Sequence, residues 1–130
     1  MKGIVLAGGT GTRLWLISRK KYSKQFLKLV DGTPLLDSPY ERLLKFFSPQ
    51  DIITITNKDY YFYVKDSCAK FSPEMEKNII SEPTGKNTAP AIALGAKFII
   101  DKLKANPDEI IFVFSSDHII KPVNEFVKYL

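Results

Sequence analysis

Short apolar runs alternate along the chain with longer stretches in which apolar residues recur at helical spacing. The runs are typical of buried β-strands, and the stretches between them are typical of amphipathic helices. Strands that alternate with helices predict βαβ units, whose right-handed crossovers give a doubly wound, three-layer αβα architecture with a mainly parallel sheet. The predicted strands are Gly3–Ala7, Asp51–Thr56, Asn78–Ser81 and Ile110–Phe114, and the predicted helices are Ser38–Phe47, Lys58–Phe71, Thr88–Lys104 and Val123–Leu130.

The composition is typical of one globular domain. The chain has 130 residues, of which 45% are hydrophobic and 25% are charged, so it is long enough to bury a core. No segment approaches the ~20 consecutive apolar residues of a membrane span, and the apolar run near the N-terminus is too short for a secretory signal. The single cysteine, Cys68, excludes an internal disulfide and is interpreted as structural. We therefore expect a cytoplasmic protein that has no membrane partner.

The net charge of +5 indicates attraction to anions, although most lysines are scattered along the sequence. The densest basic cluster directly follows a glycine-rich segment. This position favours a small phosphorylated ligand over a nucleic-acid groove, so no nucleic-acid partner is expected. The cluster comprises Arg13, Arg19, Lys20, Lys21 and Lys24.

The glycine-rich segment begins where the first predicted strand ends, at Gly8-Gly9-Thr10-Gly11-Thr12. Glycines let backbone N–H groups approach a polyphosphate, and open α/β sheets bind ligands at the carboxyl ends of their strands. Arg13 adds a planar donor group for phosphate oxygens. The segment alone is a weak signal, because no Gly-Lys-Ser/Thr follows and Leu14 replaces the third glycine of the dinucleotide fingerprint.

Two acidic residues, Glu82 and Asp117, each follow a predicted strand. In a parallel sheet, both would lie at the same edge as the glycine segment. Asp117 is therefore a candidate Mg²⁺ ligand beside the phosphates, with a helix cap or turn as the alternative. His118 is a possible general base, but phosphoryl-type transfer depends on positioning and charge neutralisation, so we interpret it as structural.

The carboxylate of Glu82 could select a base, because guanine presents N1–H and N2–H donors on its Watson–Crick edge. Asn87 is the alternative candidate for this role. The same segment is also where a helix is predicted to begin, so Asn87 or Thr88 is equally a candidate N-cap.

Four segments in this order resemble the mannose-1-phosphate guanylyltransferase (GDP-mannose pyrophosphorylase) family of sugar-phosphate nucleotidyltransferases. They are the glycine segment with Arg13, residues 18–27 with Lys24-Gln25-Phe26-Leu27, residues 82–91, and Ser115-Ser116-Asp117-His118. Residues 82–91 read Glu-Pro-Thr-Gly-Lys-Asn-Thr-Ala-Pro-Ala, which distinguishes the guanylyl branch from thymidylyl and uridylyl relatives.

The resemblance implies a Rossmann-like nucleotidyltransferase fold and transfer of GMP from GTP to mannose 1-phosphate, giving GDP-mannose and pyrophosphate with Mg²⁺. By the same resemblance, the glycines hold the nucleotide, Arg13 and Lys24 act in catalysis by neutralising phosphate charge, and Asp117 holds the metal. The expected nucleotide-binding residues are Leu6, Ala7, Gly8, Gly9, Gly11, Thr12, Arg13, Lys24, Glu82 and Asn87.

Family enzymes continue well beyond the Asp-His motif, so we expect residues 1–130 to be the N-terminal, nucleotide-binding part of the domain, truncated at its C-terminal side. The strand Ile110–Phe114 would then expose an apolar edge that favours self-association or a homo-oligomer. Three prolines of the family pattern are replaced here by Leu16, Ser23 and Ser115.

Two alternatives to this enzyme stay open. One is a non-catalytic remnant that binds nucleotide, or a fragment that complements a second chain. The other is a guanylyltransferase of the molybdenum-cofactor type, against which residues 24–27 and 82–88 argue.

Overall fold

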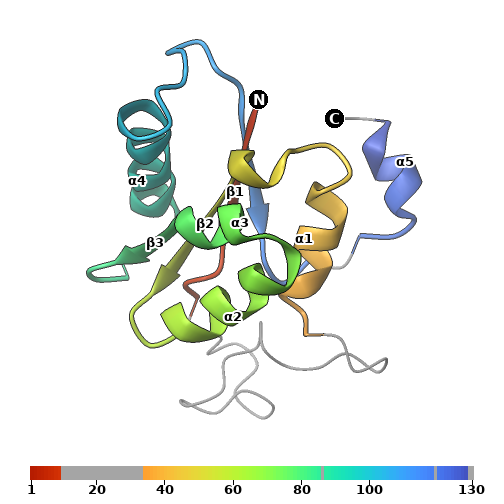
Figure 1. Ribbon diagram of the computed structural model, residues 1–130, viewed down its shortest axis with the longest axis horizontal. Helices are drawn as coiled ribbons and strands as arrows, with labels where there is room; N and C mark the ends of the chain where they lie inside the picture. The colour runs from red at the N-terminus through yellow and green to blue at the C-terminus, as the bar shows by residue number, and fades with distance from the viewer. Residues whose placement is uncertain (10–33, 86, 119, 129–130) are drawn as a thin grey trace.

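The computed structural model describes residues 1–9, 34–85, 87–118 and 120–128. Strands and helices alternate along these residues, as the hydrophobic pattern predicts (Figure 1). The elements are β1 (Lys2–Leu6), α1 (Asp37–Leu43), the 3₁₀ helix η3 (Pro49–Asp51), β2 (Ile52–Asn57), α2 (Tyr61–Phe71), α3 (Pro73–Lys77), β3 (Ile79–Glu82), α4 (Thr88–Asp101), β4 (Ile111–Ser115) and α5 (Val123–Val127).

The strands form one parallel sheet in the order β3-β2-β1-β4. In its register, Leu6 of β1 pairs with Ile55 of β2 and with Ser115 of β4, while Asn57 of β2 pairs with Glu82 of β3. The carboxyl ends of all four strands therefore lie along one edge of the sheet.

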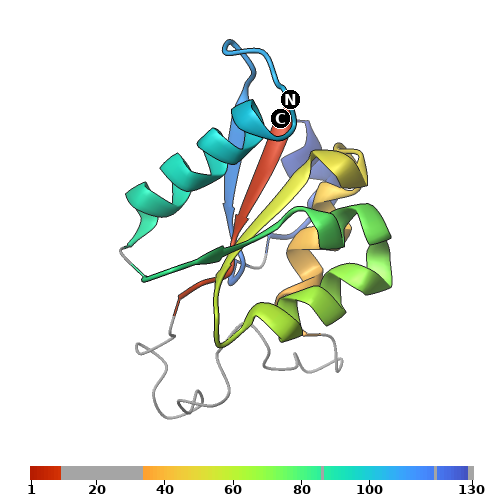
Figure 2. The ribbon, with the colours of Figure 1, turned by 60° about the vertical axis from the view of Figure 1, so that its left-hand side comes forward.

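Helices cover both faces of the sheet, as Figures 1 and 2 show, with α4 on one side and α1, α2 and α3 on the other. Ile4, Ile53 and Ile55 pack under α4 with Ala91 and Ile99. The alternate strand positions pack against the other helices in a larger cluster that includes Val5, Tyr40, Leu43, Phe47, Val64 and Phe114. Central strands that are buried on both faces explain the continuous apolar runs. The predicted three-layer α/β fold is confirmed.

Buried side-chain hydrogen bonds connect α1, β2 and α2 within the larger cluster. The Tyr40 hydroxyl of α1 lies 2.8 Å from Thr54 Oγ1 of β2, and Cys68 Sγ of α2 donates to the same hydroxyl at 3.4 Å. Burial raises the pKa values of both Tyr40 and Cys68. Cys68 is a free thiol inside the core, a position that suits the structural interpretation.

The predicted strand bounds differ from the observed ones by one residue, because ladder hydrogen bonds rather than apolar side chains define the ends. β1 begins and ends one residue earlier than predicted, and the other strands begin and end one residue later. Glu82 is therefore the last residue of β3 rather than the residue after it.

The predicted helix bounds were wrong at several ends. α1 begins at Asp37 and ends at Leu43, after which turn hydrogen bonds continue to Phe47. α2 begins at Tyr61 because, in the preceding turn, Asn57 Oδ1 accepts a hydrogen bond from the Tyr60 N–H. α4 ends at Asp101, and α5 ends at Val127.

Two short elements, η3 and α3, were not predicted from the sequence. The signals for α3 were Pro73 in its first turn and Ser72 at the N-cap, where Ser72 Oγ accepts from the Glu74 N–H at 3.2 Å. None of the described helices combines the length and the apolar character that crossing a membrane requires.

Candidate functional site

The predicted site residues that the structure describes lie along the carboxyl edge of the sheet. Glu82 ends β3, Gly8 and Gly9 follow β1, and Asp117 follows β4. Neighbouring strands are ~4.8 Å apart, so β3 and β4 lie about 14 Å from each other, with the glycines between them. The edge therefore carries a carboxylate near each end and a glycine segment in the middle. Gly11, Thr12, Arg13 and Lys24 lie outside the described residues.

The start of the glycine segment is held tightly against the sheet. Leu6 ends β1, and the N–H of the buried Ala7 donates to the Ile55 carbonyl at 2.7 Å. A Cβ on Gly8 would lie 2.8 Å from Glu82 Oε2, so a larger residue would require this carboxylate to move. Gly9 is exposed, and a Cβ there would meet no atom of the described residues within 4 Å.

Two side chains at the end of β2 hold this segment in place. Thr56 Oγ1 donates to the Ala7 carbonyl at 3.2 Å, and Asn57 Nδ2 donates to the Gly8 carbonyl at 2.9 Å. Neither residue was predicted from the sequence. The signal was available, because a polar pair at the carboxyl end of a predicted parallel strand lies where such sheets bind ligands.

Glu82 is a buried carboxylate, with only 9% of the residue exposed. Burial raises its pKa above the ordinary value, because the charged form loses hydration. A carboxylate desolvated in this way at a ligand-binding edge is typical of a functional group.

Asn87 occupies the N-cap position of α4 with φ 71° and ψ −173°. This region of backbone space is essentially reserved for glycine and costs about 1–3 kcal/mol for other residues. Asn87 is thus the N-cap residue, one of the two candidates that the sequence offered, but its side chain makes no capping hydrogen bond. Backbone strain of this kind clusters at ligand-binding segments.

Asp117 is half-buried two residues after β4, and Ser115 Oγ donates to its Oδ1. Mg²⁺ is usually held by one or two carboxylates together with ligand phosphates, and a single oriented carboxylate fits that arrangement. The described residues contain no cluster of three or more His, Cys, Asp or Glu side chains that could hold a metal alone. The neighbouring His118 is exposed, and its carbonyl oxygen accepts from Arg42 Nη1 at 3.5 Å.

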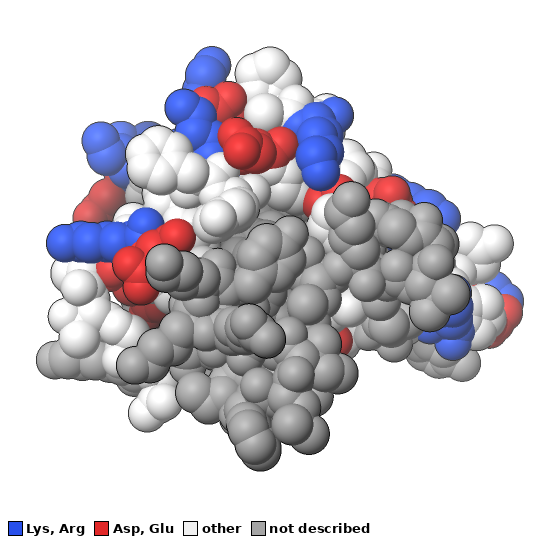
Figure 3. All heavy atoms as spheres, turned by 90° about the horizontal axis from the view of Figure 1, so that it is seen from below, with Lys and Arg blue, Asp and Glu red and all other residues white. Residues whose placement is uncertain are grey.

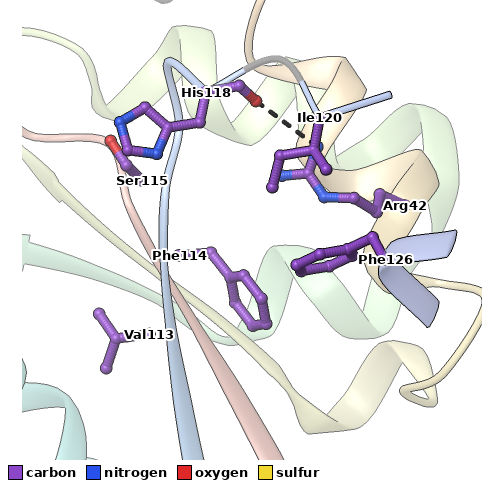
Figure 4. A pocket seen from close by; sticks show the side chains of 7 residues that line it. All are labelled: Arg42, Val113, Phe114, Ser115, His118, Ile120 and Phe126. Carbon is purple, nitrogen blue, oxygen red and sulfur yellow. Dashed lines mark hydrogen bonds between the residues drawn. The ribbon is translucent and has the colours of Figure 1, made fainter. Parts of the chain in front are cut away.

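A pocket of about 260 Å³ lies at the outer side of β4, away from β3. Arg42 and Phe126 lie on one side of it and His118 and Ser115 on the other (Figure 4). The Arg42 guanidinium is 5.5 Å from the Phe126 ring centroid. Its Nε has no hydrogen-bond partner among the described residues. Burial lowers the pKa of Arg42. The remaining lining residues are Val113, Phe114 and Ile120, so the walls are mainly apolar.

Charges of both signs are interspersed among the described residues on the side of the molecule seen from below. Among the described residues there, lysines and arginines lie beside aspartates and glutamates (Figure 3).

A family model described as nucleotidyl transferase matches residues 2–130. The chain belongs to the nucleotidyl transferase family. Among the curated relatives of this nucleotidyltransferase, a mannose-1-phosphate guanylyltransferase of Escherichia coli is 41% identical over 126 residues, which cover 95% of this chain and 26% of the relative. The alginate biosynthesis protein AlgA of Pseudomonas fluorescens is 39% identical over 117 residues, covering 90% and 23%. The nucleotidyltransferase chain thus spans about a quarter of the length of these relatives.

A solved structure shows the same fold. The protein named mannose-1-phosphate geranyltransferase from Thermus thermophilus aligns with a TM-score of 0.79 and 28% identity, over 98% of this chain and 35% of that one. Together these findings confirm the family resemblance, the α/β fold class and the nucleotidyltransferase type that the sequence predicted.

Proposed function

We propose that this nucleotidyltransferase binds GTP along the carboxyl edge of its sheet and transfers GMP to mannose 1-phosphate. The observation that carries the proposal is the order of groups at this edge. Glu82 ends β3, the glycine segment follows β1, and Asp117 follows β4. A nucleoside triphosphate has its base and its outer phosphates at opposite ends. This edge has a buried carboxylate at one end, a half-buried carboxylate at the other and the glycine segment between them.

Glu82 is the proposed base-selecting residue. Its buried carboxylate can accept hydrogen bonds from N1–H and N2–H of guanine. Adenine presents N6–H₂ and no N1–H, so it would leave part of the buried Glu82 acceptor without a hydrogen bond. An unpaired acceptor costs more binding free energy when it is buried than when water can reach it. The proposed role of Asn87 is to hold the nucleotide from the start of α4, at its strained backbone position.

The phosphates are proposed to lie along Gly8 and Gly9, with Arg13 and Lys24 neutralising their charge. Asp117 would hold Mg²⁺, which when bound supplies charge neutralisation at the phosphates. The relatives named as mannose-1-phosphate guanylyltransferases support mannose 1-phosphate as the acceptor.

In the proposed reaction, a phosphate oxygen of mannose 1-phosphate attacks the α-phosphorus of GTP. The bond from this phosphorus to the bridging oxygen breaks, pyrophosphate leaves with that oxygen, and GDP-mannose forms. Such a transfer depends on positioning and on charge neutralisation, so it requires no covalent intermediate on the protein.

The test combines nucleotide titration with an assay of pyrophosphate release. We expect GTP to bind at least about tenfold more tightly than ATP, which corresponds to about 1.4 kcal/mol. Pyrophosphate release should require both mannose 1-phosphate and Mg²⁺, and Arg13→Ala should abolish binding or turnover. Equal affinity for the two nucleotides would contradict the role of Glu82.

A nucleotide-binding role without turnover is the second candidate, and it is favoured because the described groups at the carboxyl edge include the proposed nucleotide-binding residues Gly8, Gly9 and Glu82. GTP binding with no pyrophosphate release at high protein concentration would support this candidate. Recovery of turnover on addition of a second polypeptide would support a complementing fragment.

A further inference from the structure

We propose that Asn57 is a positioning residue that fixes the glycine segment against Glu82, an inference that rests on the proposed function. Asn57 is the last residue of β2, the strand that lies between β1 and β3. It pairs in register with Glu82, and its side chain reaches across to the Gly8 carbonyl. It therefore connects the segment proposed for the phosphates with the residue proposed for the base.

The Asn57 amide is fixed at both ends. Its Nδ2 donates to the Gly8 carbonyl at 2.9 Å, while its Oδ1 accepts from the Tyr60 N–H at 3.1 Å. An amide flip would place donor against donor and acceptor against acceptor, so only one orientation satisfies both partners. Because the Gly8 carbonyl and the Gly9 N–H share one planar peptide group, holding the carbonyl also sets the direction of that N–H.

The same residue, Gly8, is the contact point for Glu82. The position of a Cβ on Gly8 lies 2.8 Å from Glu82 Oε2 and 3.7 Å from the Asn57 backbone nitrogen. A rotation of the Gly8 peptide would therefore change both the approach of the glycine segment and the packing of the Glu82 carboxylate. Asn57 restricts this rotation, and it does so without any need to touch the nucleotide.

The decisive variant is Asn57→Asp, because it keeps the side-chain size and the acceptor for Tyr60 but removes the donor to Gly8. It also turns a carboxylate oxygen toward the Gly8 carbonyl oxygen. Asn57→Ser is the second variant, since its hydroxyl can still accept from Tyr60 in an ST-turn but is too short to reach Gly8.

Asn78→Asp is the matched control. Asn78 Nδ2 also donates to a backbone carbonyl at 2.9 Å, that of Gln50, and Asn78 precedes β3 at the opposite edge of the sheet. The control therefore loses the same kind of hydrogen bond at a place remote from Gly8.

Two measurements on the full chain test the inference. In the ligand-free protein, the amide resonances of Gly8 and Gly9 should shift in both Asn57 variants and stay in place in Asn78→Asp. In titrations with GTP, the Kd should rise about tenfold in the Asn57 variants and stay within about twofold of the wild type in the control.

The inference is overturned if the Gly8 and Gly9 resonances do not move, or if both the Asn57 and the Asn78 variants raise the Kd equally. It is also overturned if GTP binds the Asn57 variants as tightly as the wild type. If the wild-type chain binds no GTP while these resonances shift only in the Asn57 variants, the proposed function fails and the fixing of the glycine segment by Asn57 stands.

Discussion

Two residues at the carboxyl edge each have a feature that lowers the stability of a folded protein. Glu82 carries a carboxylate buried from water, and Asn87 has a backbone conformation suited to glycine. Both features cost stability. Desolvation is the one influence resolved on the pKa of Glu82, and the Asn87 side chain makes no capping hydrogen bond among the described residues. We infer that both are retained for the ligand, and each cost can be measured.

The first prediction concerns Glu82→Gln and pH. Burial raises the pKa of Glu82 in the folded protein above its ordinary value of 4.5, so the folded state keeps this proton to higher pH than the unfolded chain does. The contribution of Glu82 to the free energy of unfolding therefore falls as pH rises from about 4.5 through the raised pKa. Glu82→Gln removes this dependence, so the variant should become increasingly more stable than the wild type across that range. Urea unfolding between about pH 4 and 8 checks this, and parallel pH profiles would contradict it.

The second prediction concerns the strain at Asn87. Asn87→Gly should raise the free energy of unfolding by about 1 kcal/mol, because glycine adopts positive φ without a steric cost. The variant should also bind GTP more weakly, since it loses the side-chain amide. Lys104→Gly is the control, because Lys104 also has a positive φ, 53°, three residues after the end of α4. The control should gain similar stability with unchanged GTP affinity, and equal weakening in both variants would argue against a role for Asn87.

At the level of elements, α4 owes its close approach to the sheet to one glycine. A Cβ on Gly95 would lie 2.7 Å from Ile4 Cδ1 and 2.8 Å from Ile55 Cδ1. Both isoleucines are fully buried, so they have little room to move. Glycine has a low helix propensity, but at position 95 it allows the backbone of α4 to pack directly on β1 and β2.

The third prediction follows from this packing. Gly95→Ala should lower the free energy of unfolding by about 1 kcal/mol, because overpacking of the core outweighs the gain in helix propensity. Gly85→Ala is the control, since a Cβ there meets no atom of the described residues within 4 Å. Urea denaturation of both variants is the measurement. A more stable Gly95→Ala would show that Ile4 and Ile55 can rearrange.

For the whole molecule, β4 forms one of the two outer edges of the sheet that the structure describes. In the order β3-β2-β1-β4, this strand has a hydrogen-bonded neighbour on one side. Val113 in the strand and Ile110 just before it are 40% and 60% exposed. Unpaired strand edges with apolar side chains promote association with other chains.

The fourth prediction is that the chain self-associates through this edge as its concentration rises. Val113→Lys should reduce the association, because a lysine on an edge strand opposes pairing with a second edge. Sedimentation velocity over a range of concentrations measures the effect. Phe62→Lys is the control, because Phe62 is 73% exposed on α2, on another surface. Equal loss of association in both variants would point to a different interface.

The sequence by itself determined the elements and the family. Apolar periodicity and the Gly8-Gly9 pair are local sequence signals, which can be read without knowing the tertiary structure. The four described strands and four of the described helices could therefore be predicted to within a few residues. The helix α3 was not predicted, because its sequence signals are the N-cap Ser72 and Pro73 rather than an apolar period.

Only the tertiary structure decided which residues at the edge meet. Strand order and register arise from pairing between distant segments, and they bring Asn57 to Gly8 and Gly8 to Glu82. The burial that raises the pKa of Glu82 and the strain at Asn87 are likewise consequences of packing. Local patterns specify which segments can pair, but contacts across 49 residues of sequence require the folded sheet.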